Sequence, residues 1–150
     1  MADTHASSCA CAAIRQASRQ VTQLYDQALA PFGLRLSQYQ VLARLQRSGP
    51  RAMAAFAADL GMDRTTLARN LQPLERDGLL RLEPDPDDGR KRRLVVTAAG
   101  ARRVERAREG WKQAQQRFEK AFGKERTGQL MQLLQSLSLT AANASDEVVS

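Results

Sequence analysis

Residues 59–100 constrain the fold more than any other part of this chain. Within them, residues 60–67 read Leu-Gly-Met-Asp-Arg-Thr-Thr-Leu, which is typical of the turn and second helix of a helix-turn-helix. Gly61 can adopt the positive φ that a tight turn between two helices often needs. Asp63 can cap the second helix, because its carboxylate can accept hydrogen bonds from the first free backbone N–H groups. The segment therefore predicts a helix-turn-helix with its second helix starting near residue 64.

The second helix has an apolar face and a polar face. Leucines at intervals of four and three residues predict a buried stripe, formed by Leu67, Leu71 and Leu74. The side chains on the other faces are cations, hydroxyls and an amide, the types that contact base edges and phosphates in the major groove. They are Arg64, Thr65, Thr66, Arg69 and Asn70. We expect this helix to read DNA.

Two short alternating segments follow and predict a β-hairpin. Gly78 is expected to end the reading helix, and residues 79–83 and 92–96 form the two strands. The connection between them is rich in Pro, Asp and Gly, which favours a turn. We interpret its acidic residues as turn formers, with Asp88 pairing with Arg90, and not as a cation site. The tip carries the cations Arg90, Lys91, Arg92 and Arg93. A hairpin beside a reading helix is a wing, and we expect Arg90, Lys91 and Arg92 to contact DNA.

Two shorter helices are predicted before the turn. Ser37-Gln38-Tyr39-Gln40 has the Ser-x-x-Gln form of a capping box and opens the first, which Gly49 and Pro50 end. Residues 53–60 supply the second. Pro73 removes one hydrogen bond from the reading helix, so we expect a bend there. Because Leu74 keeps the apolar period, we expect the helix to continue beyond the proline rather than to end early.

Amphipathic helices are predicted at both ends of the chain, over residues 8–30, 98–122 and 125–142. Pro31 ends the first, Thr97 caps the second and Gly123 separates the last two. Their apolar stripes are Ile14, Ala17, Val21, Leu24 and Ala28; Val104, Ala107, Trp111, Ala114, Phe118 and Ala121; and Leu130, Leu133, Leu134, Leu137 and Ala141. A winged helix does not need these stripes, so we expect a twofold homodimer to bury them.

The charge of the chain favours nucleic acid as a partner. A net charge of +7 and a sequence pI near 10.2 indicate an anionic partner, although basic proteins of other classes exist. No apolar run approaches the roughly 20 residues of a membrane span, and the N-terminus lacks the order of a signal peptide. We expect a cytoplasmic protein that is not membrane-bound.

No arrangement of residues predicts catalysis. The only histidine is His5, in the N-terminal tail, and the chain has no phosphate-binding loop or dinucleotide fingerprint. His5, Cys9 and Cys11 match no standard zinc spacing. We expect no enzyme, no cofactor and no metal.

Four segments in order resemble the MarR family of bacterial winged-helix transcription regulators. They are residues 63–66 (Asp-Arg-Thr-Thr), 74–79 (Leu-Glu-Arg-Asp-Gly-Leu), 85–90 (Asp-Pro-Asp-Asp-Gly-Arg) and 94–100 (Leu-Val-Val-Thr-Ala-Ala-Gly). The resemblance implies a mainly α fold with a small β-hairpin wing, in which N- and C-terminal dimerisation helices flank a winged helix-turn-helix. Within a single chain of residues 8–150, we expect dimerisation helices at 8–32 and 98–142, the DNA-binding domain at 37–97, and flexible tails at 1–7 and 143–150.

The function implied is sequence-specific binding of double-stranded DNA. We expect a repressor that binds a palindromic operator as a homodimer and is released by a small aromatic or phenolic acid. For that acid, Arg15 is the candidate carboxylate partner, with Tyr39 and Phe56 as apolar walls. Core packing is the alternative interpretation of both aromatic residues.

Thiol chemistry is the alternative switch. One peroxide-sensing branch of the family has a reactive cysteine near the start of the first helix, hydrogen-bonded to tyrosines. Cys11 matches that position, Tyr25 follows as in that branch, and Cys9 is a second thiol. Two further tyrosines of that branch are Arg15 and Leu36 here, although Arg15 would favour a thiolate at Cys11. The pair therefore predicts either an oxidant-sensing regulator or, as a rival, a thiol-based redox protein.

Overall fold

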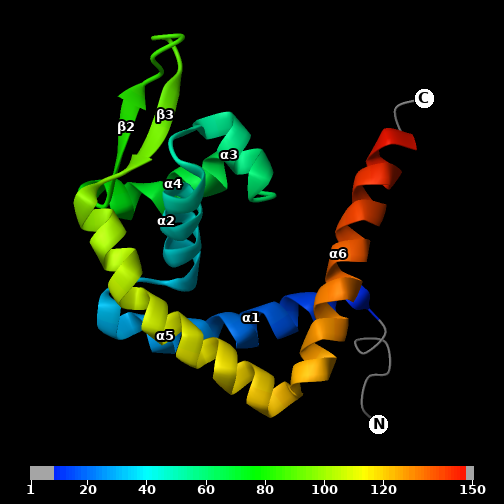
Figure 1. Ribbon diagram of the computed structural model, residues 1–150. Coiled ribbons are helices and arrows are strands. Elements are labelled where there is room, and N and C mark those ends of the chain that lie inside the picture. The colour runs from blue at the N-terminus through cyan, green and yellow to red at the C-terminus, as the bar shows by residue number, and fades with distance from the viewer. Residues whose placement is uncertain (1–8, 148–150) are drawn as a thin grey trace. The chain divides into compact units, whose positions relative to one another are not determined.

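The computed structural model describes the backbone of residues 9–147 and the side chains of residues 9–137. Along the chain it contains α1 (Ala10–Leu29), η2 (Ala30–Phe32), α2 (Leu36–Ser48), β1 (Arg51–Ala52), α3 (Met53–Asp59), α4 (Arg64–Arg76), β2 (Leu80–Pro84), β3 (Arg92–Val96), α5 (Ala98–Phe122) and α6 (Lys124–Glu147) (Figure 1). The predicted fold class, mainly α with a small β-hairpin, is confirmed. No helix in the described part of the chain is long and apolar enough to cross a membrane.

The chain divides into two compact units. The first covers Met1–Gln113 and therefore includes every element from α1 to β3 and the larger part of α5. The second covers Ala114–Ser150 and contains the end of α5 and α6. The residues predicted to read DNA all belong to the first unit.

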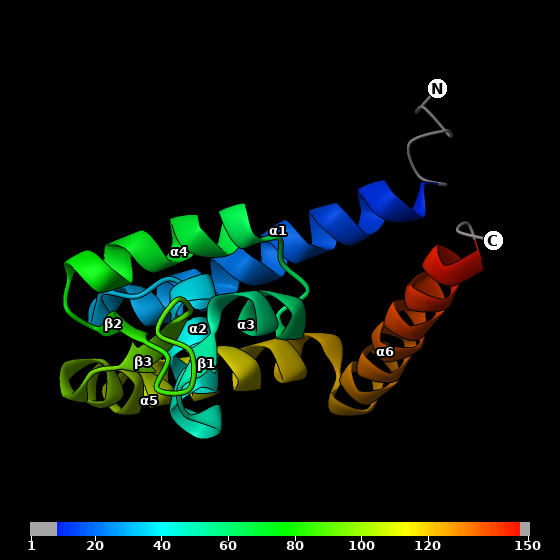
Figure 2. The ribbon, with the colours of Figure 1, turned by 90° about the horizontal axis from the view of Figure 1, so that it is seen from above.

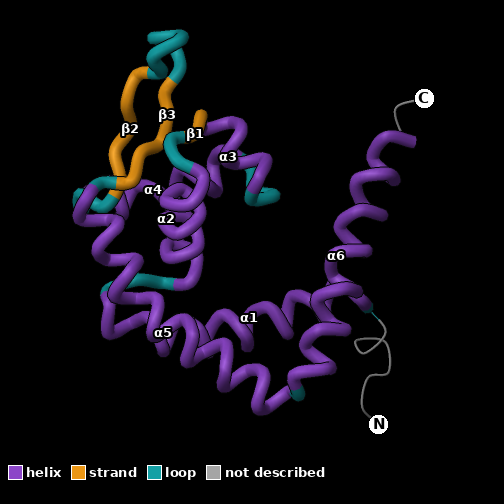
Figure 3. The backbone as a smooth tube through the Cα atoms, in the orientation of Figure 1, coloured by secondary structure: helices purple, strands orange, loops and turns teal. Residues whose placement is uncertain are grey.

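One antiparallel sheet lies in the first unit, with the strand order β1-β3-β2 (Figure 3). In the β2–β3 hairpin, Leu80 pairs with Val96 and Pro84 pairs with Arg92. The predicted hairpin is confirmed, with β2 starting one residue later than expected. Strand β1, which pairs Arg51 with Leu94 on the other edge of β3, is an addition to the prediction. Two residues are too few to show the alternation by which a strand is recognised.

The core of the first unit joins the helices to the sheet. Helix α4 packs against both α2 and β2, and α3 packs against α4 and β3 (Figure 2). The predicted leucine stripe of α4 is buried, with Leu67 0%, Leu71 3% and Leu74 1% exposed. Further large side chains that are fully buried are Phe56, Leu29, Leu42, Leu45, Leu80 and Leu94. This packing fixes the polar face of α4, on the side opposite to the leucine stripe, relative to the hairpin.

The start of α2 differs from the sequence prediction. The helix begins at Leu36, so Ser37 lies inside it and the predicted Ser37–Gln40 capping box is wrong. The backbone N–H of Arg35 donates to Gln38 Oε1 at 3.0 Å, and the N–H of Leu36 donates to Asp26 Oδ1 at 2.7 Å. A carboxylate from α1 therefore caps α2, which no local pattern in the sequence indicates.

The apolar stripes of the flanking helices are only partly buried. On α5, Val104, Ala107 and Ala114 are buried as predicted, whereas Ala121 is exposed. On α1, residues 10–20 are exposed, and Ile14 is 43% exposed. The predicted stripe of α1 is therefore not buried within the single chain over its first half.

Helix α6 shows the largest departure. Leu133 is 68% exposed and Leu137 is 50% exposed, so this stripe is not buried within the single chain. Its burial in a homodimer stays a prediction. The side chain of Ala141 lies outside the described residues. The helix runs to Glu147, beyond the predicted end at residue 142 and into the segment expected as a tail. Within this unit, Phe118 stacks on Phe122 with ring centres 5.6 Å apart.

Candidate nucleic-acid interface

Local chemistry fixes both ends of α4. Gly61 has φ +62°, as the turn requires, and the Asp63 side chain accepts from the backbone N–H of Thr66 at 2.9 Å. At the other end Gly78 has φ +68°, and the N–H groups of Gly78 and Leu79 donate to the carbonyls of Glu75 and Leu74. This is a Schellman motif. The predicted cap, turn and helix end are confirmed, and the helix continues through Pro73.

The polar residues predicted to read DNA lie on the faces of α4 that the core leaves open. Arg64, Thr65, Thr66 and Arg69 are exposed, and Asn70 is half-buried. Two of them have side-chain partners. The Thr66 hydroxyl donates to Asp63 Oδ2 at 2.6 Å, and Asn70 Nδ2 lies 3.9 Å from Met62 Sδ. The hydrogen bonds from Thr66 hold the pKa of Asp63 below its ordinary value, which keeps the cap charged.

The acidic residues of the wing shape its tip. Asp85 Oδ1 accepts from the N–H groups of Asp87 and Asp88, and Asp88 Oδ1 accepts from the N–H of Arg90 at 3.1 Å. The interpretation of these acids as turn formers is confirmed. Asp88 therefore pairs with Arg90 through the backbone N–H, whereas its ion pair is with Lys91 Nζ at 3.8 Å.

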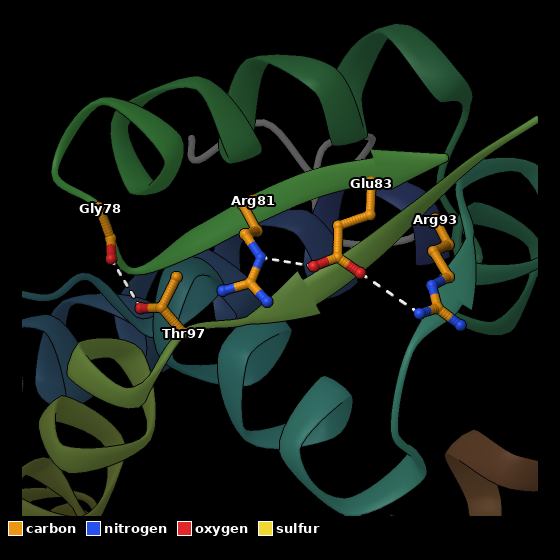
Figure 4. Close-up of polar contacts among 5 residues, drawn as sticks. All are labelled: Gly78, Arg81, Glu83, Arg93 and Thr97. Atoms are coloured by element: carbon orange, nitrogen blue, oxygen red, sulfur yellow. Dashed lines mark hydrogen bonds and ion pairs between the residues drawn. The ribbon is translucent and has the colours of Figure 1, made fainter. Parts of the chain in front are cut away.

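The cations of the wing fall into two groups. Arg90, Lys91 and Arg92 are exposed at the tip, and among the described residues no carboxylate forms an ion pair with Arg90 or Arg92. In the strands that lead to the tip, Glu83 Oε1 accepts from Arg81 Nε at 2.6 Å and Glu83 Oε2 accepts from Arg93 at 3.3 Å (Figure 4). Both bonds lower the pKa of Glu83, and the bond from Arg81 has the larger effect. Arg93 therefore differs from its neighbours, because it forms an ion pair with the residue opposite it in the hairpin.

One side chain connects the reading helix, the wing and α5. The Thr97 hydroxyl donates to the Gly78 carbonyl at 2.6 Å (Figure 4). It also accepts from the N–H of Gly100 at 3.0 Å. Thr97 therefore caps α5 as predicted. In the same contact it fixes the end of α4 against the start of α5.

A pocket of about 780 Å³ lies in the first unit beside the helix-turn-helix, lined from α2, the turn after α3, and α5. Its apolar wall includes Tyr39 and Trp111, whose rings stack with centres 6.4 Å apart. Its cationic lining is Arg44, Arg47, Arg108 and Lys112. The carboxylate in the lining is Asp59, which forms an ion pair with Arg51. Burial raises the pKa of Tyr39, against the opposing effect of Arg108 and Arg47, so its hydroxyl is neutral.

The candidate ligand residues from the sequence are not brought together in this pocket. Tyr39 lines it, but Phe56 is completely buried in the core and Arg15 lies exposed on α1. Sequence reasoning missed Arg47 and Arg108 as lining residues. Both belong to amphipathic helices on which a cation is ordinarily solvated, so no local signal distinguishes them.

The thiol candidates are exposed at the start of α1. Cys9 is its N-cap residue, and both Cys9 and Cys11 are free. Tyr25 is buried beside Trp111, with ring centres 6.3 Å apart, and follows Cys11 by fourteen residues on the same helix. That spacing corresponds to about 21 Å along a helix axis. Contact between Cys11 and Tyr25 therefore requires a second chain, and the thiol switch stays a prediction.

Metal binding has no support in the described part of the chain. It contains no group of three or more His, Cys, Asp and Glu side chains placed to hold a metal ion. His5 lies outside the described residues.

Comparisons with known proteins agree with this geometry. A family model described as MarR family matches residues 32–91. YwoH of Bacillus subtilis (strain 168), an uncharacterised HTH-type transcriptional regulator, is 28% identical to this chain over 92 residues. The match covers 61% of this chain and 66% of YwoH, just under two thirds of its length. The crystal structure of the M. tuberculosis transcriptional regulator MosR in complex with DNA is 34% identical, with a TM-score of 0.75, over 88% of this chain and 98% of that one. The PcaV regulator of Streptomyces coelicolor, solved with its natural ligand, shares the fold at 23% identity, with a TM-score of 0.82 over 94% and 99% of the two chains.

Proposed function

Because the chain belongs to the MarR family of transcription regulators, we propose that it is a repressor that binds a palindromic operator as a homodimer. DNA binding and transcription regulation follow from the family. The repressor role, the palindrome and the dimer are the proposal. A regulator of this kind acts on DNA in the bacterial cytoplasm, and it needs no catalytic group.

The open polar face of α4 beside a cationic wing tip carries the proposal. Helix-turn-helix proteins place the second helix in the major groove, where Arg and Asn side chains read base edges. We assign that role to Arg64, Thr65, Thr66, Arg69 and Asn70. The wing tip, with Arg90, Lys91 and Arg92, is assigned to the DNA backbone or the minor groove. MosR, a relative at 34% identity, was solved in complex with DNA, which supports DNA as the partner of this chain.

Replacing Arg90 by alanine is expected to weaken binding to every duplex and to reduce the slope of log affinity against log salt by about 1, as loss of one phosphate contact does. Fluorescence anisotropy with a promoter fragment at several salt concentrations measures this slope. Arg81→Ala is the matched control, because it removes the same charge from an arginine that lies outside the tip and is ion-paired with Glu83. Equal slopes for wild type and Arg90→Ala would exclude the wing tip from the interface.

Exposed apolar residues support the homodimer. The predicted dimerisation segments, residues 8–32 and 98–142, contain the exposed side chains Ile14, Met131, Leu133 and Leu137. Soluble monomers rarely expose such rows. A second copy would bury them and would hold two reading helices about 34–36 Å apart, as two half-sites of one operator require.

We further propose that a small aromatic acid releases the operator by binding in the pocket beside Tyr39 and Trp111. The pocket combines two stacked aromatic rings with an excess of cations, which suits a ring that carries a carboxylate. Arg47 and Arg108 are the proposed carboxylate partners, in place of Arg15. Both arginines line the pocket together with Tyr39, and Arg108 also forms an ion pair with Glu105 at 3.0 Å.

Trp111, the only tryptophan of the chain, can report this binding. Titration with 4-hydroxybenzoate is expected to quench its fluorescence saturably and to lower operator affinity. Arg108→Gln should lower the affinity for the acid at least about tenfold, as loss of a charge-assisted hydrogen bond does. If Arg15→Gln produces that loss instead, the carboxylate binds on α1. If the wild type ignores the acid and releases DNA with hydroperoxide, Cys9 and Cys11 are the switch.

A further inference from the structure

Met62 contacts both the reading helix and the pocket. It is a half-buried residue in the turn between α3 and α4, and its side chain lines the pocket that contains Tyr39 and Trp111. Its Sδ also lies 3.9 Å from Nδ2 of Asn70, the half-buried member of the proposed reading residues. Met62 therefore lines the pocket and also contacts an amide that we assign to base reading.

The backbone at Met62 is anchored, so only its side chain is free to respond. Its N–H donates to the Ala57 carbonyl at 2.9 Å, and the N–H of Gly61 donates to the Ala58 carbonyl at 3.0 Å. Asp63, the next residue, caps α4. A methionine side chain is unbranched and has three rotatable bonds, so it can move aside without moving the turn.

Asn70 needs a fixed amide to discriminate between bases. Asparagine reads adenine by a bidentate contact to N6 and N7, which requires the amide plane to keep one orientation. The N–H···S contact is weak on its own, but it gives the half-buried amide a partner within the protein. Leucine in place of Met62 would fill similar volume without an acceptor.

We infer that Met62 is a positioning residue that orients Asn70 for base reading, and that a ligand displacing Met62 from the pocket side releases Asn70. This inference rests on the proposed DNA and ligand binding. A ligand in the pocket would then change the discrimination between bases while the cationic contacts of Arg64, Arg69 and Arg90 stay in place. A ligand would therefore reduce discrimination between bases more than it reduces non-specific affinity.

A double-mutant cycle tests the first half of this inference. Operator affinity is measured for Met62→Leu, Asn70→Ala and the double variant, against a set of single-base-pair changes in the half-site. Met62→Leu is expected to lose about threefold or more of discrimination, as coupled contacts do. The loss should fall at the base pair that Asn70→Ala affects, and the double variant should be no worse than Asn70→Ala. Additive losses, or losses at different base pairs, would overturn the inference.

Two further variants separate positioning from packing. Met62→Gln provides an amide oxygen as acceptor at a similar length and should restore discrimination. Met53→Leu makes the same chemical change at a half-buried methionine that packs against the core and is absent from the pocket lining, and should leave discrimination unchanged. Loss of discrimination in Met53→Leu, or no recovery in Met62→Gln, would assign the effect to packing and refute positioning.

The second half is tested with 4-hydroxybenzoate at a concentration that saturates Trp111 quenching. The acid should flatten discrimination at the Asn70 base pair in the wild type and should have no further effect there in Met62→Leu. An equal effect of the acid in both proteins would overturn the route through Met62. Failure of the proposed function is seen separately, as wild-type protein that prefers no promoter fragment over bulk DNA, or a Trp111 signal that no acid changes.

Discussion

Replacement of Gly100 by alanine is expected to destabilise the first unit by about 3 kcal/mol or more, because the new methyl group meets backbone. A Cβ at this buried position would lie 1.9 Å from the Leu79 carbonyl oxygen and 2.9 Å from Val96 Cγ1. The Leu79 carbonyl cannot retreat freely, since it accepts the N–H of Thr97 at 3.1 Å. Relief of the clash must therefore separate the start of α5 from the hairpin, which also breaks the Thr97 contact with the end of α4.

Urea unfolding followed by Trp111 fluorescence measures this change, and about 3 kcal/mol is a large fraction of the 5–15 kcal/mol typical of a domain. Gly128→Ala is the control, since a Cβ there meets nothing within 4 Å. It lies inside α6, where alanine is favoured over glycine by up to about 1 kcal/mol, so it should be neutral or stabilising. A Gly100→Ala protein with the midpoint of the wild type would show that this junction is not rigid.

The features that sequence predicted correctly are those that depend on neighbours in the chain. The cap at Asp63, the helix end at Gly78 and the cap at Thr97 each involve residues within a few positions. Their chemistry is visible in the sequence because the partners are adjacent. The carboxylate that caps α2 comes from Asp26, ten residues away from Leu36 and on another helix, so the nearer Ser37 was the wrong candidate.

The same distinction applies to the candidate site. Four consecutive wing cations look equivalent in the sequence, but the hairpin register places Glu83 opposite Arg93 and leaves Arg90 and Arg92 without such a partner among the described residues. The pocket joins α2 to α5 across about seventy residues, so its cations could not be assigned from spacing. An apolar residue such as Phe56 suits the wall of a pocket as well as a protein core, and only its burial shows that it belongs to the core.

Helix α6 presents the apolar row from which the second large effect is expected. Leu133 and Leu137 are one helical turn apart and are 68% and 50% exposed. Burying one leucine on a partner chain is worth about 1.5–3 kcal/mol, which an aspartate would reverse by placing a charge in the apolar contact. Leu133→Asp is therefore expected to yield a monomer. Operator affinity should fall by about 100-fold or more, since two linked half-sites gain that much over one.

Sedimentation at micromolar concentration and anisotropy with the operator measure the two effects together. Gln135→Asp is the matched control, because it adds the same charge to an exposed position two residues on, on the far side of the helix from Leu133. It should stay dimeric and bind DNA as the wild type does. A Leu133→Asp protein that remains a dimer would place the interface elsewhere. A dimer-deficient variant that still binds the whole operator with wild-type affinity would break the link between assembly and recognition, since a single reading helix would then suffice.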